Sequence, residues 1–259
     1  MSGEDRERAR SLGLDLTPLS LQQLVVRASG RSAGADSLTE KDLGVNAMIN
    51  VARYHLVQPV LFVTLPLGML AFLFAVNAAR GGDTWRDGLA VIFLYFFIMG
   101  VQRVGGRWLP FGLALGATRR SFYAGTALLG VSMSLVSGLV MAGLQAIERA
   151  TGGWGLSITF FRVPHLLNGP WYATWLTSFV GLSALFVYGM WYGIVYRRWG
   201  TLGVLAFIAV QVPVALAYSW SGVGGHLAGL SALDLTGVIA ALTVVFLAGG
   251  HATIRRATV

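Results

Sequence analysis

Apolar runs of about twenty residues recur along most of the chain and are separated by short polar or basic segments. In helical conformation a run of this length crosses the hydrocarbon core of a bilayer, because each residue adds about 1.5 Å to a helix. The pattern therefore predicts an all-α membrane protein with six transmembrane helices. Their expected ranges are about 57–78, 84–102, 122–147, 172–196, 201–219 and 235–254. The second apolar run itself covers only 88–102, so that helix is expected to extend into its flanks.

The residues before the first apolar run follow a different pattern. Residues 1–43 are polar with mixed charge, a composition typical of a weakly ordered tail. Residues 44–56 carry apolar positions at helical spacing: Val45, Met48, Ile49, Ala52 and Leu56. This spacing predicts an amphipathic helix on the membrane surface, with a simple extension of the first span as the alternative. The expected organisation is a cytoplasmic tail, 1–43, followed by a transmembrane domain, 44–259.

Composition agrees with this class. The chain is 55% hydrophobic and only 12% charged, about half the usual charged share of a soluble domain. The net charge of +8 lies at the ends of apolar runs rather than on a polar domain, which argues against a nucleic-acid partner. The absence of cysteine excludes disulfides, thiolate metal sites and a cysteine nucleophile. The four histidines are scattered without metal-ligand spacing, so no metal site is expected.

The distribution of basic residues predicts the orientation, since cytoplasmic segments carry an excess of lysine and arginine. With both termini in the cytoplasm, the inner segments carry Lys41, Arg53, Arg103, Arg107, Arg119, Arg120, Arg197, Arg198, Arg255 and Arg256. The outer loops then carry only Arg80, Arg86, Arg149 and Arg162. The expected location is the cell membrane of a bacterium, its inner or plasma membrane.

Two adjacent arginines, Arg119 and Arg120, interrupt the apolar stretch FGLALGATRRSFYAGT. One arginine at the bilayer centre costs about 2.5–3.5 kcal/mol, and no carboxylate lies nearby in sequence. The pair is therefore expected at the inner surface, in a cytoplasmic loop of about 103–121. Within that loop WLPFGLALGA is apolar but too short to span, which predicts a short helix that ends in Thr-Arg-Arg. This helix is either re-entrant or interfacial, held by inner charge alone, or a docking element for a cytoplasmic partner.

Several motifs resemble the permease subunit of ABC-2 type ATP-binding-cassette transporters. They are LALGATRRSFYAGTALLG, QAIERATGGWG, MWYGIVYRRWG and the terminal RRATV, and the resemblance covers about 44–259. The pattern Gly-x-Thr-Arg-Arg-x-Phe falls on Gly116, Thr118, Arg119, Arg120 and Phe122.

The resemblance implies an exporter in which two permease chains, here expected to be a homodimer, bind two ATPase chains. The loop between the second and third spans, with 108–118 as its candidate segment, would act as the coupling helix. The residues expected to contact the ATPase are Leu109, Phe111, Gly112, Gly116, Thr118, Arg119 and Arg120. The arginines would pair with acidic groups on the ATPase or with lipid phosphates. Substrate-binding residues are not assigned.

The chain carries no nucleotide-binding motif of its own. Its single lysine, Lys41, lies in TEKDLG, so no phosphate-binding Gly-x-x-x-x-Gly-Lys loop exists. The chain is therefore expected to be a transport subunit rather than an enzyme and to bind no cofactor, while ATP and Mg²⁺ belong to the ATPase partner.

Three other function classes stay open. A secondary transporter usually needs an ionisable residue inside the membrane, and no acid lies inside a predicted span, although Glu148 and Asp234 lie near outer ends. A membrane enzyme is suggested only weakly by Gly-Leu-Ser at Ser183 and Ser231, because such tripeptides are common in glycine-rich spans. A scaffold without transport is a further alternative.

Four further features carry expectations. The outer loop, about 148–171, is interpreted as an amphipathic piece on the membrane surface, with a cap over an exit route as the alternative. Gly189 and Gly193 predict close helix packing, within the chain rather than across a dimer. Gln102, Gln145 and Gln211 are expected to bond between helices or to face a substrate path. The glycine-rich segment 221–234 is a candidate re-entrant element.

Overall fold

The computed structural model describes residues 64–81, 85–106, 108–114, 118–162, 167, 169–220 and 229–254. The chain divides into two compact units, Met1–Val45 and Asn46–Val259, and every described residue belongs to the second. Five predicted features lie outside the described residues: the tail 1–43, the surface helix 44–56, the beginning of the first span at 57–63, Gly116, and 221–228 of the re-entrant segment.

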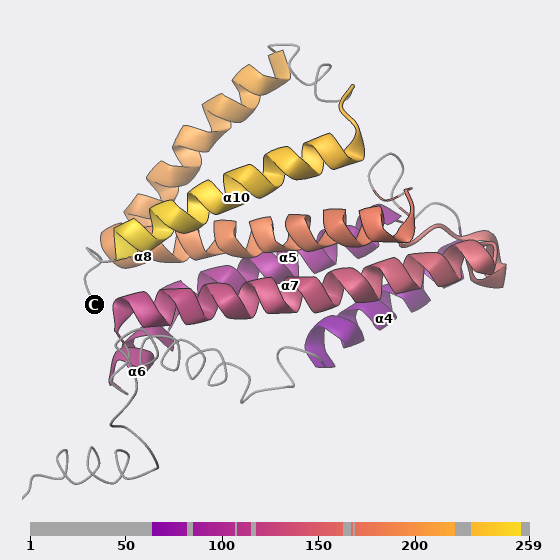
Figure 1. Ribbon diagram of the computed structural model, residues 1–259, viewed down its shortest axis with the longest axis horizontal. Helices are drawn as coiled ribbons and strands as arrows, with labels where there is room; N and C mark the ends of the chain where they lie inside the picture. The colour runs from indigo at the N-terminus through magenta and orange to yellow at the C-terminus, as the bar shows by residue number, and fades with distance from the viewer. Residues whose placement is uncertain are drawn as a thin grey trace, which may run out of the picture. The chain divides into compact units, whose positions relative to one another are not determined.

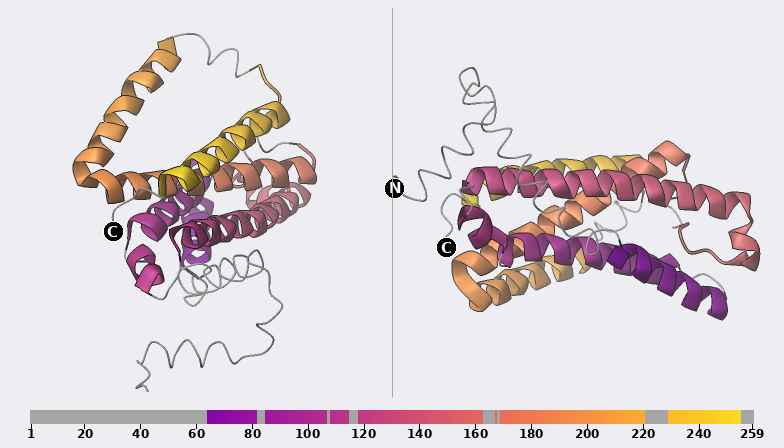
Figure 2. Two further views of the ribbon diagram at one scale, coloured as in Figure 1. Left: turned by 60° about the vertical axis from the view of Figure 1, so that its left-hand side comes forward. Right: turned by 90° about the horizontal axis from the view of Figure 1, so that it is seen from below.

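Six α-helices and one short π-helix follow one another along the described chain (Figure 1). The α-helices are α4 (Leu65–Arg80), α5 (Trp85–Gly105), α6 (Trp108–Ala114), α7 (Arg119–Ala150), α8 (Trp171–Trp220) and α10 (Ala232–Ile254). The π-helix, η3, covers Gly153–Ser157. Helix α8 packs against α5, α7 and α10, while α4 packs against α5 (Figure 2).

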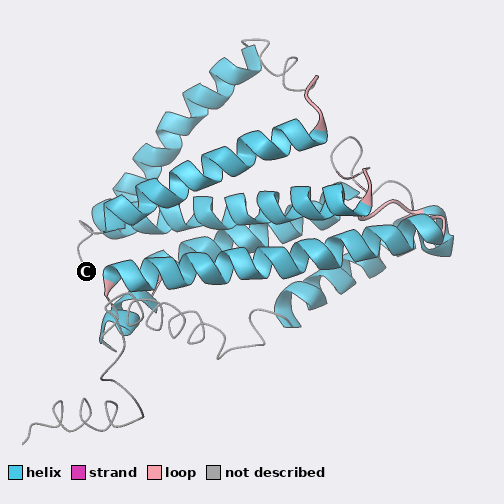
Figure 3. Cartoon of the chain, in the orientation of Figure 1, coloured by secondary structure: helices cyan, strands magenta, loops and turns pink. Residues whose placement is uncertain are grey.

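The prediction of an all-α chain is confirmed for the described residues, which contain helices and connecting loops but no strand (Figure 3). Three helical segments are long and apolar enough to cross a membrane: Arg119–Ala150, Trp171–Ala217 and Ala232–Ile254. Two shorter apolar segments, Leu67–Arg80 and Val91–Gly105, accompany them. The chain is therefore a membrane protein by the length and composition of its helices.

Helix α8 consists of two helical parts joined at a single residue. Gly200 has φ 64° and ψ −158°, a backbone region that is open almost only to glycine. The two helices expected at 172–196 and 201–219 therefore meet with no loop between them, and Figure 1 shows the sharp bend. Gln211 joins the two parts, because its Oε1 accepts hydrogen bonds from the Tyr192 hydroxyl at 3.1 Å and from the Tyr188 hydroxyl. Gln211 thus bonds between helices, as one of its two interpretations predicted.

Helices α5 and α8 approach closely at glycines. A methyl group added at Gly189 would overlap the carbonyl oxygen of Phe97, and one added at Gly100 would overlap that of Phe186. At Gly193 an added Cβ would lie 2.7 Å from the backbone nitrogen of Gly105. The prediction that Gly189 and Gly193 pack within the chain is confirmed.

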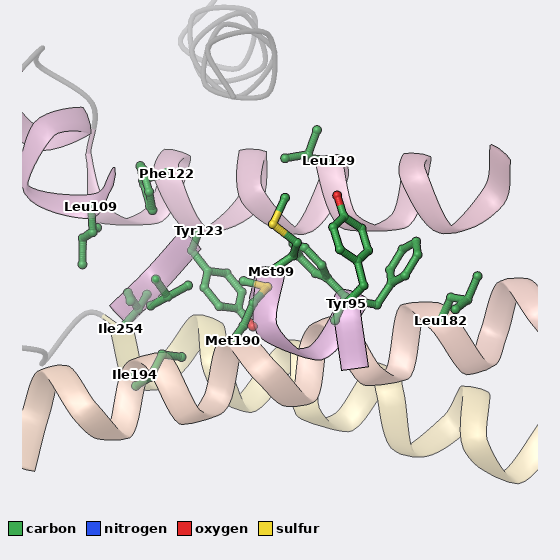
Figure 4. Packing of buried hydrophobic residues seen from close by; sticks show 13 residues of the cluster. Tyr95, Met99, Leu109, Phe122, Tyr123, Leu129, Leu182, Met190, Ile194 and Ile254 are labelled. Carbon is green, nitrogen blue, oxygen red and sulfur yellow. The ribbon is translucent and has the colours of Figure 1, made fainter. Parts of the chain in front are cut away.

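The main core lies between α5, α7 and α8, with contributions from α6 and α10 (Figure 4). Its buried members are Tyr95, Phe96, Met99, Val104, Leu109, Phe122, Tyr123, Leu129, Leu182, Phe186, Met190, Ile194 and Ile254. Polar contacts hold α10 against this core: the Tyr123 hydroxyl donates to the Leu247 carbonyl at 3.1 Å, and the Trp191 indole donates to that of Phe246 at 2.8 Å. Burial of large side chains and these bonds together orient α10.

Candidate functional site at the α6 end

Helix α6 is a seven-residue element that links the end of α5 to the beginning of α7. Its sequence, WLPFGLA, is apolar throughout, yet at about 1.5 Å per residue it reaches only a third of the way across a bilayer core. Pro110 is tolerated because it lies in the first turn, where backbone N–H groups have no partner within the helix.

The residues of α6 divide between an inner and an outer face. Leu109 is 1% exposed and belongs to the main core. Gly112, one turn later, is also buried, and an added Cβ would lie 2.7 Å from the ring of Phe122. Phe111 is 51% exposed. Two of the predicted contact residues, Leu109 and Gly112, therefore anchor α6 to the bundle, whereas the Phe111 side chain is exposed.

Two arginines fix the junction between α5 and α6. Arg103 is 0% exposed, and its guanidinium carbon lies 4.3 Å from the centre of the Trp108 ring, a cation–π contact. Arg197 of α8 donates from Nε to the Val104 carbonyl at 3.4 Å and from a terminal nitrogen to the Gly106 carbonyl. Positive side chains are favourable at the carboxyl end of α5, where the helix dipole is negative.

The sequence analysis treated Arg103 and Arg197 only as inner-surface charges and missed this structural role. The signal for Arg103 was the aromatic Trp108 five residues later, on the next element. No comparable signal marks Arg197, since its acceptors are backbone carbonyls about ninety positions earlier in the chain.

Thr118 caps the beginning of α7. Its Oγ1 accepts a hydrogen bond from the backbone nitrogen of Ser121 at 3.1 Å, and the Ser121 hydroxyl donates back to the Thr118 carbonyl at 3.0 Å. This exchange satisfies one of the donors that a helix leaves unpaired at its amino end. Thr118 is thus the N-cap residue of α7.

Arg119 and Arg120 are the first two residues of α7, so the expectation that they end the short helix inside a loop is wrong. Arg119 is half-buried and Arg120 is exposed. The amino end of a helix is positively polarised, and a cation there costs about 0.3–1 kcal/mol. The helix dipole therefore does not account for the pair.

Described arginines gather at the α6 end: Arg103, Arg119, Arg120, Arg197 and Arg198. Among the side chains that the structure describes, no aspartate or glutamate lies at this end. The opposite end, where α7 finishes and α8 begins, carries Arg80, Arg149, Arg162, Glu148 and Asp234. The two ends thus differ in charge.

Glu148 organises the opposite end. Its side chain is 2% exposed, and its Oε2 accepts hydrogen bonds from the backbone nitrogens of Phe161 at 2.8 Å and Phe160 at 3.2 Å. The Trp154 indole donates to the same oxygen at 3.1 Å. Three donors converge on this one oxygen, and hydrogen bonds to a carboxylate are stronger than those to a neutral acceptor. Glu148 therefore holds the following loop against the end of α7.

The loop after α7 contains a run of left-handed backbone. Gly152, Gly153 and Gly155 have φ of 63°, 87° and 71°, and Trp154 between them has φ 63°, which disfavours any residue with a Cβ. The Trp154 ring contacts that of Phe74 at 5.2 Å between centroids, in addition to the bond to Glu148. These contacts offset the backbone strain.

A second apolar cluster lies beneath this loop. Phe160, Phe161 and Leu167 are buried against Leu70 of α4 and Met141 of α7. The favoured interpretation of 148–171 as an amphipathic piece on the surface is therefore wrong for Ile158, Phe160 and Phe161, which are buried and lie outside any helix. Sequence reasoning missed this because the donors from Phe160 and Phe161 to Glu148 are backbone groups.

One serine considered for catalysis has a capping role. The Ser231 hydroxyl donates to the Asp234 carboxylate at 2.7 Å and accepts from the Asp234 backbone nitrogen at 3.2 Å. This reciprocal pair is a capping arrangement at the beginning of α10. Ser183 is buried within α8.

Comparison with known proteins finds no matching family model, no matching curated protein and no matching solved structure.

Proposed function

We propose that this chain is the permease subunit of an ABC-2 type exporter. In this proposal six helices of each chain cross the cell membrane of a bacterium, both termini and the α6 end face the cytoplasm, and two copies form the pathway. Two separate ATPase chains bind below and supply ATP and Mg²⁺. The proposal is supported by the sequence resemblance, by the long apolar helices, and by the arginines at the α6 end, which the positive-inside rule favours for a cytoplasmic face.

The attachment of α6 to the bundle carries the proposal. Leu109 and Gly112 fix α6 against the core, and Trp108 lies on Arg103 at the end of α5. A force on the outer face of α6 would therefore move α5 and α7 together. An interfacial helix held by charge alone would not need a buried Leu109 or a glycine against Phe122.

The outer face of α6 and the beginning of α7 offer the chemistry of a docking surface. Phe111 presents an exposed aromatic ring, and Arg120 presents an exposed guanidinium close to it in sequence. In the proposed complex the ring fills an apolar groove on the ATPase. Arg119 and Arg120 pair with carboxylates at its rim or with lipid phosphates.

No observation favours the secondary-transporter alternative. Glu148 is the buried carboxylate among the described side chains, and three N–H donors hold one of its oxygens. This is the environment of a structural cap, in which the carboxylate orders a loop.

Charge reversal tests the proposal. The double variant Arg119→Glu with Arg120→Glu is expected to insert and fold normally, because the side chains lie at the edge of the bundle. It should retain about tenfold less ATPase subunit on purification, since like charges across an interface disfavour association. The measurement is the amount of ATPase per permease chain, together with ATP-driven transport.

Arg198→Glu is the matched control, because Arg198 is an exposed arginine at the same end that lies outside the docking surface. It should retain the ATPase. Normal assembly and transport in the double variant would remove Arg119 and Arg120 from the coupling role.

A further inference from the structure

An apolar pocket of about 340 Å³ lies between α4, α5 and α7. It occupies the space between the two buried clusters: Tyr95, Phe96 and Leu129 on its walls belong to the main core, and Leu70 and Met141 belong to the second. Ligand pockets in proteins begin at about 300 Å³ and are mostly apolar. The pocket therefore has room for one small molecule.

One side of the pocket is buried and the other is open to the surroundings of the helices. Leu70 and Met141 are buried, whereas Leu67, Val136 and Val140 are exposed lining residues. In a membrane these exposed side chains face lipid, so a molecule dissolved in the bilayer reaches the pocket without crossing water.

The lining excludes charged ligands. None of the lining residues that the structure describes is charged. Burying a charge without a partner costs several kcal/mol, so an ammonium, phosphate or carboxylate has no place here. A phospholipid would have to leave its headgroup outside.

The polar side chains among the lining residues all carry hydroxyl groups. Ser132 and Ser137 lie on α7, and Tyr95 extends from α5 toward α7 (Figure 4). A hydroxyl both donates and accepts hydrogen bonds, which suits an alcohol, ether or carbonyl group on the ligand.

Three methionines, Met69, Met133 and Met141, line the same pocket, one on α4 and two on α7. Methionine is unbranched and polarisable, so it adapts to ligands of different shape. The lining is therefore suited to ligands of several shapes rather than to a single shape.

We propose that this pocket is a binding site for a neutral, largely apolar small molecule that carries a hydroxyl or carbonyl group and enters from the bilayer. As a binding site it needs no ATPase; only its use as the cargo site of an exporter rests on the proposed function.

Photolabelling tests the site. The chain, in phosphatidylcholine nanodiscs, is exposed to a long-chain alcohol that carries a diazirine, and adducts are located by mass spectrometry. Labelling at Met133 and Met141 should saturate and fall at least tenfold with excess unlabelled alcohol. Labelling at Leu139, which is exposed and does not line the pocket, should rise linearly. Linear labelling at all three positions would overturn the proposal.

Variants sharpen this test. Ser137→Trp fills the pocket and should reduce the saturable labelling at least tenfold, whereas Leu139→Trp, on the exposed side of the same helix, should leave it unchanged. Val136→Trp is a second filling variant should Ser137→Trp fail to fold. Unchanged saturable labelling in a folded filling variant would contradict the site.

Two competitors test the ligand class. An alkylammonium of the same chain length should compete at least tenfold less well than the alcohol, and equal competition would overturn the neutral class. Phosphatidylcholine with a diazirine in its acyl chain should label the pocket no more than Leu139. Preferential labelling by this lipid, undisplaced by the alcohol, would assign the pocket to a bilayer lipid. Saturable binding of the alcohol without its ATP-driven export would contradict the use of the pocket as the cargo site and leave the binding site standing.

Discussion

At the scale of single residues, charged side chains in this chain have structural roles that their position alone does not reveal. Arg103 is buried against Trp108, Arg197 bonds to the carbonyls of Val104 and Gly106 at the end of α5, and Glu148 holds a loop through three N–H donors. Each of these side chains contacts a specific partner in a neighbouring element or loop. These residues shape the two ends of the helix bundle.

Replacing Glu148 by glutamine should destabilise the fold. The variant keeps an acceptor oxygen but loses the charge that strengthens three hydrogen bonds, and it buries an amide group. We expect a loss of about 2 kcal/mol in the free energy of unfolding. The measurement is denaturant unfolding in mixed micelles. Arg149→Gln, an exposed change in the same turn, should stay within about 0.5 kcal/mol of the original chain. Equal stability of Glu148→Gln would refute the capping role.

Gly112→Ala tests how α6 is attached. The new methyl would lie 2.7 Å from the fully buried ring of Phe122, so α6 or the ring must shift. Overpacking of this kind costs about 1–3 kcal/mol. Gly143→Ala is the control, because an added Cβ there meets nothing within 4 Å. In thermal unfolding, Gly112→Ala should unfold at a lower temperature than Gly143→Ala. Identical unfolding curves would mean that this contact does not fix α6.

At the scale of elements, glycine decides where helices approach and where they turn. Gly100 and Gly189 bring the backbones of α5 and α8 together, and small residues in general permit such contact in lipid. Gly200 has a different use, since its left-handed φ lets the two parts of α8 meet without a loop.

Gly189→Ala should be among the most disruptive conservative changes in the chain. The added methyl overlaps a backbone carbonyl, which moves only if the whole of α5 moves. We expect a loss at the upper end of about 1–3 kcal/mol. Gly181→Ala, in the same helix with nothing within 4 Å of its new Cβ, should be nearly neutral. If both variants unfold at the same denaturant midpoint, the contact between α5 and α8 is not close.

The sequence predicted the elements better than their ends. Apolar runs predicted helices because length and hydrophobicity decide membrane insertion, and Gly189 and Gly193 predicted their own contact because small residues mark helix interfaces. The placement of Arg119 in the first turn of α7 was not predictable from the apolar run, which begins only at Phe122. Residues 158–161 were misjudged because their partner atoms belong to Glu148 and α4, which local patterns do not encode.

At the scale of the whole molecule, the described charges distinguish one end of the helices from the other. Five arginines gather at the α6 end, and mixed charges gather at the end that Glu148 organises. Such an asymmetry is favourable in a cell membrane, because the anionic lipids of the cytoplasmic leaflet attract lysine and arginine. The short helix α6 packs on the main core at the basic end, and residues of the same core line the apolar pocket between α4, α5 and α7. In the proposed exporter the first receives the movement of an ATPase and the second receives the molecule to be moved.

The central claim is that another chain supplies the energy. The most direct measurement is purification of this protein from native membranes in mild detergent, with every co-purifying chain identified by mass and counted. The account predicts a soluble subunit with a phosphate-binding loop, present at one copy per permease chain. A preparation that repeatedly contains no such ATPase, in several detergents, would contradict it.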